Sequence, residues 1–210
     1  MVPLVGDCPV CHGPGTKPYG RRKQWFLSQC SDCCSVYRTV FPSEDELNEI
    51  YGSDYYDSWN IEADTGAFWE MKVQNCTSYL KGLDRYIKGS GKRTLLDVGC
   101  AHGFMLEAAV QEGYTPSGLE ISPAGDLARK RGFHVLSSPL EDDPFPPESF
   151  DVVTMVDVIE HFTDPQSALR SVWAMLKPGG VVFMVTPDIT SVPARILRGA
   201  WPHYLPEHLI

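Results

Sequence analysis

The 210-residue chain lacks features that mark several large classes of protein. No apolar run approaches the ~18 residues of a membrane-spanning helix. The opening MVPLVGDCPV places no basic segment before an apolar run, so neither a membrane span nor a secretory leader is expected. Basic residues are scarce, with 18 Lys and Arg against 27 Asp and Glu and a net charge of −9. This balance argues against nucleic acid or an anionic membrane as the partner.

What remains is the composition of an ordinary soluble protein, 43% hydrophobic and 21% charged. The length suits one α/β domain with a small appendage. Seven cysteines without a leader indicate a reducing compartment, so a cytoplasmic location is expected. Composition divides the chain into a Cys/Gly/Pro-rich zone at 1–42, a helical zone at 43–92 and alternating strands and helices at 93–210.

The first zone carries two C-x2-C pairs, separated by 18 residues: Cys8, Cys11, Cys30 and Cys33. Two such pairs supply four thiolates for one tetrahedral zinc, and a segment this poor in core residues needs a staple. We therefore expect a zinc-ribbon-like module with structural Zn²⁺. Two disulfides or unligated core cysteines are the alternative, and Cys34 is a competing ligand.

The second zone reads as helical. Ser43 and Glu46 have the spacing of a capping box, in which each side chain bonds the other residue's amide. Apolar residues then recur at helical spacing until Gly89–Gly91: Phe68, Met71, Val73, Tyr79, Leu80, Leu83 and Ile87. We interpret 43–92 as a helical lid or linker.

The third zone alternates between the two kinds of element. Strands are expected at 94–98, 115–121, 133–137, 150–156 and 181–186, and helices at 104–114, 122–132 and 164–180. The runs VVTMV and VVFMV are apolar throughout, as in strands buried on both faces. This alternation predicts a parallel sheet with right-handed crossovers.

Acidic residues stand at the ends of the first two of these strands. Asp97 precedes the turn G-C-A-H-G, with Gly99 and Gly103, which is not the G-x-G-x-x-G of dinucleotide sites. A carboxylate there would repel a diphosphate but can help to hold a cation. S-adenosylmethionine has an ammonium, a sulfonium and no phosphate. Glu120, at the next strand end, is placed to accept from two ribose hydroxyls.

At this point the chain resembles the class I S-adenosylmethionine-dependent methyltransferases, through LLDVGCAHG, GLEIS, the segment SSPLEDDPFPPESFDVVTMVDVIEHFTDP and LKPGGVVFMVTPD. It is most similar to the branch with the ubiquinone-biosynthesis O-methyltransferases and many sugar and polysaccharide methyltransferases, some of which carry N-terminal zinc modules. The resemblance implies a Rossmann-like α/β domain. Ala101 departs from the family, where glycine is frequent.

The resemblance also implies roles for individual residues. Tyr55 and Tyr56 match an aromatic segment that lids the cofactor, although a packing role is the alternative. Cys100 would belong to the turn, with a small space-filling role as its alternative. The implied cofactor-binding set is Tyr55, Asp97, Gly99, Cys100, Gly103, Glu120 for the ribose, Ile121, Leu140 and Glu141 around the adenine, and Asp157 near the sulfonium.

Methyl transfer to oxygen or carbon also requires removal of a proton, for which histidine is suited. His161, after the fourth strand, is the best-placed candidate, ahead of His203 and His208. A purely structural role for the Glu160–His161 pair is the alternative. Asp157, Glu160 and His161 could instead hold a divalent cation.

The acceptor is expected to be a small molecule, sugar or glycan, methylated at oxygen. The place of the Asn/Asp-Pro-Pro-aromatic motif of base amine methyltransferases reads MVDVIEH, which argues against that substrate. Two alternatives stay open. The zinc module could read RNA for an RNA methyltransferase, or the protein could be a non-catalytic binding protein on this fold.

After Asp188 no pair of alternating strands follows, whereas the family closes its sheet with two more. We therefore expect five of seven strands, in the order 3-2-1-4-5, with 181–186 at an edge. An apolar edge requires a cover. Residues 189–210, a second copy in a homodimer or further chain in a longer natural protein could provide it, and the third is favoured.

Overall fold

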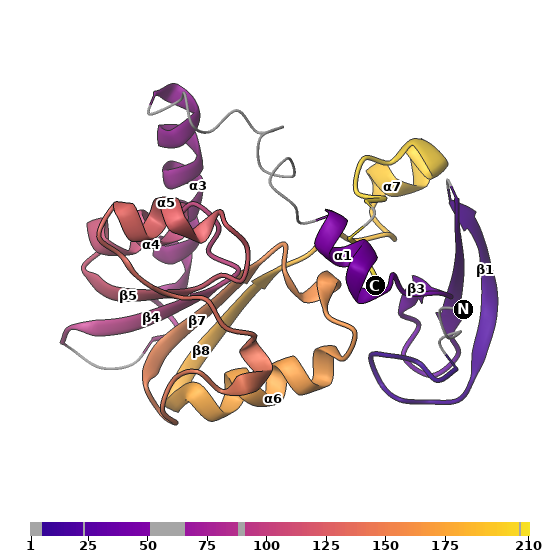
Figure 1. Ribbon diagram of the computed structural model, residues 1–210, viewed down its shortest axis with the longest axis horizontal. Helices are drawn as coiled ribbons and strands as arrows, with labels where there is room; N and C mark the ends of the chain where they lie inside the picture. Colours follow the sequence, from indigo (N-terminus) through magenta and orange to yellow (C-terminus); the bar gives the residue numbers. More distant parts are fainter. Residues whose placement is uncertain (1–5, 23, 51–65, 88–90, 206) are drawn as a thin grey trace. The chain divides into compact units, whose positions relative to one another are not determined.

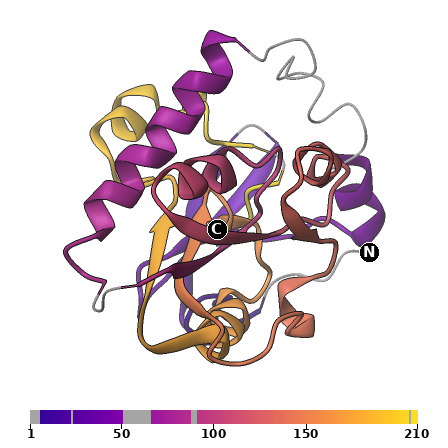
Figure 2. The same ribbon diagram turned by 90° about the vertical axis from the view of Figure 1, so that its left-hand side faces the viewer.

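The computed structural model describes residues 6–22, 24–50, 66–87, 91–205 and 207–210 (Figures 1 and 2). Its contacts divide the chain into two compact units. The first comprises residues 1–50, 157–168 and 186–210, and the second comprises 51–156 and 169–185. Among the helices within the described ranges, none has the length and apolar character needed to cross a membrane.

The second unit is built on a five-stranded parallel sheet with the order β6-β5-β4-β7-β8 (Figure 1). Numbered along the chain, this is the expected order 3-2-1-4-5, and no further strand joins the sheet within the described residues. The strands are β4 (Arg93–Val98), β5 (Tyr114–Leu119), β6 (His134–Leu136), β7 (Phe150–Val156) and β8 (Leu176–Val185). The Rossmann-like α/β fold is thus confirmed.

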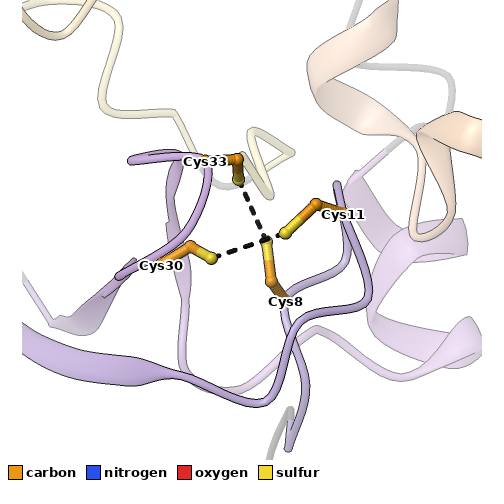
Figure 3. A group of neighbouring side chains, drawn as sticks. All are labelled: Cys8, Cys11, Cys30 and Cys33. Atoms are coloured by element: carbon orange, nitrogen blue, oxygen red, sulfur yellow. Dashed lines mark hydrogen bonds between the residues drawn. The ribbon is translucent and has the colours of Figure 1, made fainter.

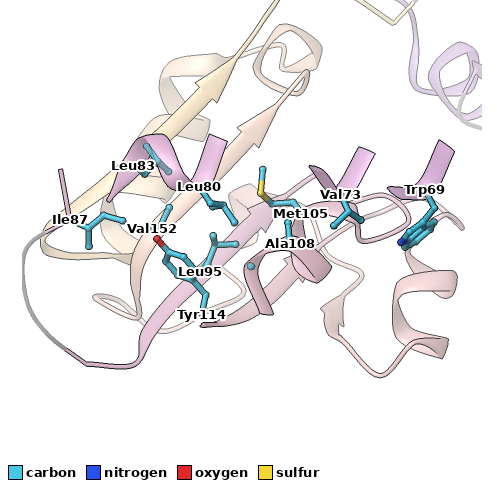
Figure 4. Packing of buried hydrophobic residues seen from close by; sticks show 11 residues of the cluster. Trp69, Val73, Leu80, Leu83, Ile87, Leu95, Met105, Ala108, Tyr114 and Val152 are labelled. Carbon is cyan, nitrogen blue, oxygen red and sulfur yellow. The ribbon is translucent and has the colours of Figure 1, made fainter. Parts of the chain in front are cut away.

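Helices α3 (Ala67–Leu83) and α4 (Phe104–Gln111) share one core with the sheet, while α5 (Gly125–Lys130) packs beside β6 (Figures 1 and 4). Leu95, Tyr114 and Val152 supply the strand side of this core. Met71, expected on the apolar face, is exposed, whereas Trp69 is buried and its indole N–H donates to a Glu107 carboxylate oxygen (2.8 Å). The buried stripe of α3 therefore runs through Trp69, Val73, Leu80 and Leu83.

Helix α6 (Pro165–Met175) is shorter than expected, because β8 begins directly after it at Leu176. Its start is as predicted: the Asp164 carboxylate accepts from the Ser167 amide (3.0 Å). Its end is not, because Pro178 cannot continue a helix and Gly179 has a φ of +82°. The expected helix over 164–180 was therefore wrong for its last residues, which belong to the edge strand.

The first unit contains an antiparallel sheet, β1 (Thr16–Arg22), β2 (Trp25–Cys30) and β3 (Val36–Arg38), and the helices α1 (Glu44–Ile50) and α7 (Val192–Leu197). The predicted capping box is present: the Ser43 N–H donates to Glu46 Oε2 (2.7 Å) and the Glu46 N–H to Ser43 Oγ (3.3 Å). Apolar residues of the strands and of the C-terminal region form one cluster: Leu27, Val36, Ala194, Trp201 and Tyr204.

Ala194, Trp201 and Tyr204 thus pack on the cysteine-bearing module. The proposed domain division, with boundaries at residues 42 and 92, stays a prediction.

Candidate functional site

The carboxyl end of β4 presents a deeply buried acid. Asp97 is 5% exposed, and the Thr154 hydroxyl, from neighbouring β7, donates to its Oδ1 (2.6 Å). Burial raises the pKa of Asp97 to about 7 from its ordinary 3.8; the Thr154 bond opposes the rise and the Glu120 charge adds to it. A nearby cation strongly stabilises the ionised form of a carboxyl that is so far from water.

The turn after β4 is held open by two glycines with positive φ, Gly99 (+70°) and Gly103 (+93°). A Cβ on Gly103 would lie 3.0 Å from the Cβ of Ala128, so close packing as well as the left-handed conformation requires glycine. Ala101 also has a positive φ, +43°. Gly99 is exposed, so a ligand can approach the backbone there.

Glu120, directly after β5, spans the turn with its side chain. Its Oε2 accepts from the Ala101 amide (2.9 Å) and its Oε1 from the Ser122 amide (2.8 Å). The carboxylate therefore fixes the backbone that bears Ala101, which sequence reasoning did not foresee. Each oxygen has a second lone pair, so acceptance from ribose hydroxyls remains open to Glu120.

The Cys100 side chain packs in the interior of the second unit, against Leu106, Ala128 and Val135. Its Sγ lies against Gly118, where a Cβ would come within 2.5 Å of the sulfur. Burial, with the charges of Asp97 and Glu120, raises the pKa of the Cys100 thiol. Its side chain thus packs as the space-filling alternative requires, and its part in binding the cofactor stays a prediction.

The remaining predicted cofactor residues differ in exposure. Ile121 is largely exposed beyond β5, as an adenine contact requires. Leu140 is buried in the 3₁₀ turn Leu140–Asp142 while Glu141 is exposed. Asp157, the first residue after β7, is exposed with a φ of +53°.

Tyr55 and Tyr56 lie outside the described residues. The aromatic lid therefore stays a prediction.

A second polar group lies within the first unit. Ligand atoms of Glu160, His161 and His208 all lie within 4.8 Å of one another. The His161 and His208 rings meet edge to face, with centroids 5.0 Å apart. Both histidines are candidates from the sequence alone, but no spacing rule pairs two residues that have 46 others between them. The third member beside Glu160 and His161 is thus His208, whereas the sequence suggested Asp157.

Burial is the main cause of the pKa shifts of these three side chains. It lowers the pKa of His161 to about 3, with the nearby His208 adding to the effect, and it also lowers the pKa of His208. Burial raises the pKa of Glu160 to about 7. The Thr186 hydroxyl donates to Glu160 Oε2 (3.0 Å), while Oε1 is buried without a hydrogen-bond partner. Both imidazoles are therefore neutral at pH 7.

The four predicted zinc ligands lie together (Figure 3). The Sγ atoms of Cys8 and Cys33 are 3.6 Å apart and those of Cys11 and Cys30 are 3.5 Å apart. Four thiolates at about 2.3 Å from one zinc would be about 3.8 Å apart, whereas a disulfide needs about 2.05 Å. The separations fit a tetrahedral metal site, and none of the seven cysteines forms a disulfide.

Backbone amides within the module donate to two of the four sulfur atoms. The Val10 amide donates to Cys8 Sγ (3.4 Å) and the Asp32 amide to Cys30 Sγ (3.3 Å). Although burial opposes it, hydrogen bonding with Ser35 lowers the pKa of Cys33 to about 6. Burial raises the pKa of Cys8 to about 12, and although the Gly13 backbone opposes it, hydrogen bonds with Cys33 and Cys30 raise the pKa of Cys11. The donor set is that of a structural zinc site.

Comparison with known proteins identifies a family. Residues 71–209 match the family described as "Methyltransferase domain". Ubiquinone biosynthesis O-methyltransferase of Stutzerimonas stutzeri is 36% identical over 115 residues, which are 50% of this chain and 48% of that one. The enzyme of the same name from Pseudomonas entomophila is 37% identical over 114 residues, with the same coverage. The matches thus span about half the length of these curated relatives.

Solved structures agree on the fold. A SAM-dependent methyltransferase of Thermotoga maritima, described as a possible histamine N-methyltransferase, is 25% identical with a TM-score of 0.53, over 72% of this chain and 66% of that one. A SAM-dependent methyltransferase from Archaeoglobus fulgidus is 24% identical with a TM-score of 0.52, over 66% and 62% of the two chains.

Proposed function

The chain belongs to the methyltransferase-domain family, and from this premise we propose that it transfers a methyl group from S-adenosylmethionine to a small molecule, sugar or glycan, at oxygen. The curated relatives are named O-methyltransferases, which supports oxygen as the acceptor atom. They support no particular acceptor, because the similarity covers half of each chain.

Asp97 is the observation that carries the cofactor proposal. Its buried carboxyl lies at the strand end beside a glycine turn with accessible backbone, and the Thr154 bond orients it. A cationic methionine moiety would stabilise the ionised form, which burial otherwise disfavours. The Glu120 carboxylate, which already fixes the turn, would accept from the ribose. Bound there, S-adenosylmethionine supplies an electrophilic methyl group, and the residues of the turn orient it.

His161 is the proposed base. Its neutral imidazole can accept a proton, but a pKa near 3 makes it a weak base in this structure. A catalytic role therefore requires that the bound acceptor raise the pKa of His161, by bringing a negative charge close to it. A divalent cation at Glu160, His161 and His208 is the alternative use of these residues, and neutral imidazoles suit it equally.

We further propose that Cys8, Cys11, Cys30 and Cys33 hold one structural zinc. The metal would stabilise the fold of a module with few buried apolar residues. The edge strand β8, where Val182 and Met184 are partly exposed, is the proposed surface for a second copy or for further chain. A cytoplasmic location stays an expectation.

Calorimetry with S-adenosylmethionine and with NAD tests the cofactor assignment. We expect binding of the first alone, and tighter binding of NAD would overturn the assignment. A screen with radiolabelled methyl donor against phenols, sugar nucleotides, glycans and RNA tests the acceptor class. Label transfer to RNA, at a rate that falls with salt, would contradict the small-molecule proposal.

A further inference from the structure

The cysteine cluster shares its small core with the C-terminal residues. Cys8, Cys30 and Tyr37 form a buried cluster in the first unit, and Ile210 packs against it. Two of its three buried members are proposed zinc ligands, so the metal would set the positions of most of this core. Whatever positions these cysteines therefore also positions the chain around Ile210.

Backbone hydrogen bonds extend this connection to Glu160. The Arg38 N–H, in β3, donates to the Leu209 carbonyl (2.8 Å). The Leu209 N–H donates to the Glu160 carbonyl (2.9 Å), and the Ile210 N–H donates to the same oxygen (3.3 Å). Leu209, itself 1% exposed, thus joins the strand that follows the second cysteine pair to the segment that carries His161.

These bonds hold both histidines at once. His161 directly follows Glu160, and His208 directly precedes Leu209. A bond between the Leu209 amide and the Glu160 carbonyl therefore places the two imidazoles side by side, which accounts for their 5.0 Å ring separation.

A second contact joins the cysteine module to the residues that follow His161. His12, next to the ligand Cys11, lies 3.5 Å from Asp164, measured from Nε2 to Oδ1. Both side chains are about half exposed, so this contact contributes little to stability, but it brings the loop of the first cysteine pair against Asp164. The cysteine module thus contacts residues on both sides of His161.

We propose that the cysteine cluster, with its metal bound, holds the Glu160–Asp164 segment and the Leu209 region in place, and we call this support the brace. It thereby fixes the position of His161 relative to His208. This inference rests on the zinc proposed above and not on the identity of the methyl acceptor. It gives the module an internal positioning role, in contrast to a reader of substrate. Without the metal, Cys8, Cys30 and Tyr37 are too few to keep the cysteine end of the module ordered, and the hydrogen bond from Arg38 to Leu209 loses its support on that side.

Hydrogen exchange on the full chain tests the brace, in reducing buffer and with zinc quantified. The informative amides are those of Leu209 and Ile210. The Gly99 amide, which donates to the Leu119 carbonyl in the parallel sheet (2.8 Å), is the internal reference. Chelation of the metal should accelerate exchange at Leu209 and Ile210 by at least about tenfold and leave Gly99 within about twofold.

Two matched variants sharpen the test. Cys11→Ser removes a proposed ligand and should reproduce the effect of chelation, whereas Cys34→Ser changes an exposed neighbour outside the cluster and should change neither zinc content nor exchange. In the ligand variant, the imidazole nitrogen signals of His161 and His208 should also shift, because the rings move apart.

The outcomes are distinct. Zinc that is bound and then removed without faster exchange at Leu209 would overturn the brace and leave the zinc and methyl-transfer proposals standing. Absence of zinc from the purified chain would overturn the metal and the brace together. Equal loosening of Gly99 would overturn the brace as well, because the loss would then be global.

Discussion

The Asp97→Asn substitution distinguishes two effects of the buried charge. The charge lowers the stability of the folded chain, and it is proposed to strengthen the binding of S-adenosylmethionine. The carboxyl has a folded pKa of about 7 against an ordinary 3.8, so the folded chain binds the extra proton between these values. Stability from this group is complete below about pH 4 and is lost as the pH rises through 7. The difference corresponds to ~4 kcal/mol at pH 8 as an order of magnitude.

Asparagine keeps the shape of the side chain and can still accept the Thr154 hydrogen bond, but it carries no charge. We expect Asp97→Asn to be close to neutral at pH 5 and to stabilise the cofactor-free chain by about 2–4 kcal/mol at pH 8. Binding of S-adenosylmethionine should change in the opposite direction. Wild-type affinity should increase as the pH rises from 6 to 8, and the variant should lose this increase together with most of its affinity.

Urea unfolding at pH 5 and pH 8, with calorimetry at the same two values, measures both effects. Asp142→Asn, at an exposed position, is the matched control and should change neither. A variant that is destabilised equally at both pH values would refute the argument from desolvation. Unchanged affinity for S-adenosylmethionine at pH 8 would refute the proposed pairing with the cationic end of the cofactor.

Three further outcomes are expected. Glu120→Gln should weaken S-adenosylmethionine binding by about 1.5–3 kcal/mol in calorimetry, because a charged acceptor is lost, and unchanged affinity would remove the ribose assignment. Asp151→Asn should lower the free energy of unfolding by about 1 kcal/mol at pH 7 in urea, with less effect at pH 3, because hydrogen bonds from Lys177 and Thr94 together outweigh burial and lower the Asp151 pKa; an equal loss at both pH values would contradict this. The His161 imidazole should show no titration by NMR between pH 5 and pH 8, and a midpoint near 6.5 would show that it is not buried as described.

Much of the architecture was predictable because its signals are local. Alternating apolar runs and glycine breaks predicted the strands, and the strand order followed from the resemblance to a known family. The capping box at Ser43 and the cap at Asp164 were readable because each depends on residues three apart. The two cysteine pairs predicted their own cluster for the same reason, since each pair spans one short turn.

Tertiary structure alone decided how distant residues meet. Helix α6 ends early at Met175 because Leu176 pairs with Phe150 of β7, a contact that adds to the local effect of Pro178 and Gly179. The Cys100 side chain faces inward because Gly118, on a neighbouring strand, leaves space for its sulfur. Glu120 holds the turn at Ala101 because parallel pairing brings the ends of β4 and β5 together.

The pairing of His161 with His208 is the furthest from sequence reasoning. Each residue is an ordinary histidine in its own segment, and 46 residues lie between them. Their contact depends on backbone bonds from the Leu209 and Ile210 amides to the Glu160 carbonyl, and any residue except proline could donate such a bond. Sequence by itself could therefore identify the residue types capable of the chemistry, whereas their juxtaposition arises from main-chain hydrogen bonds that carry no side-chain signature.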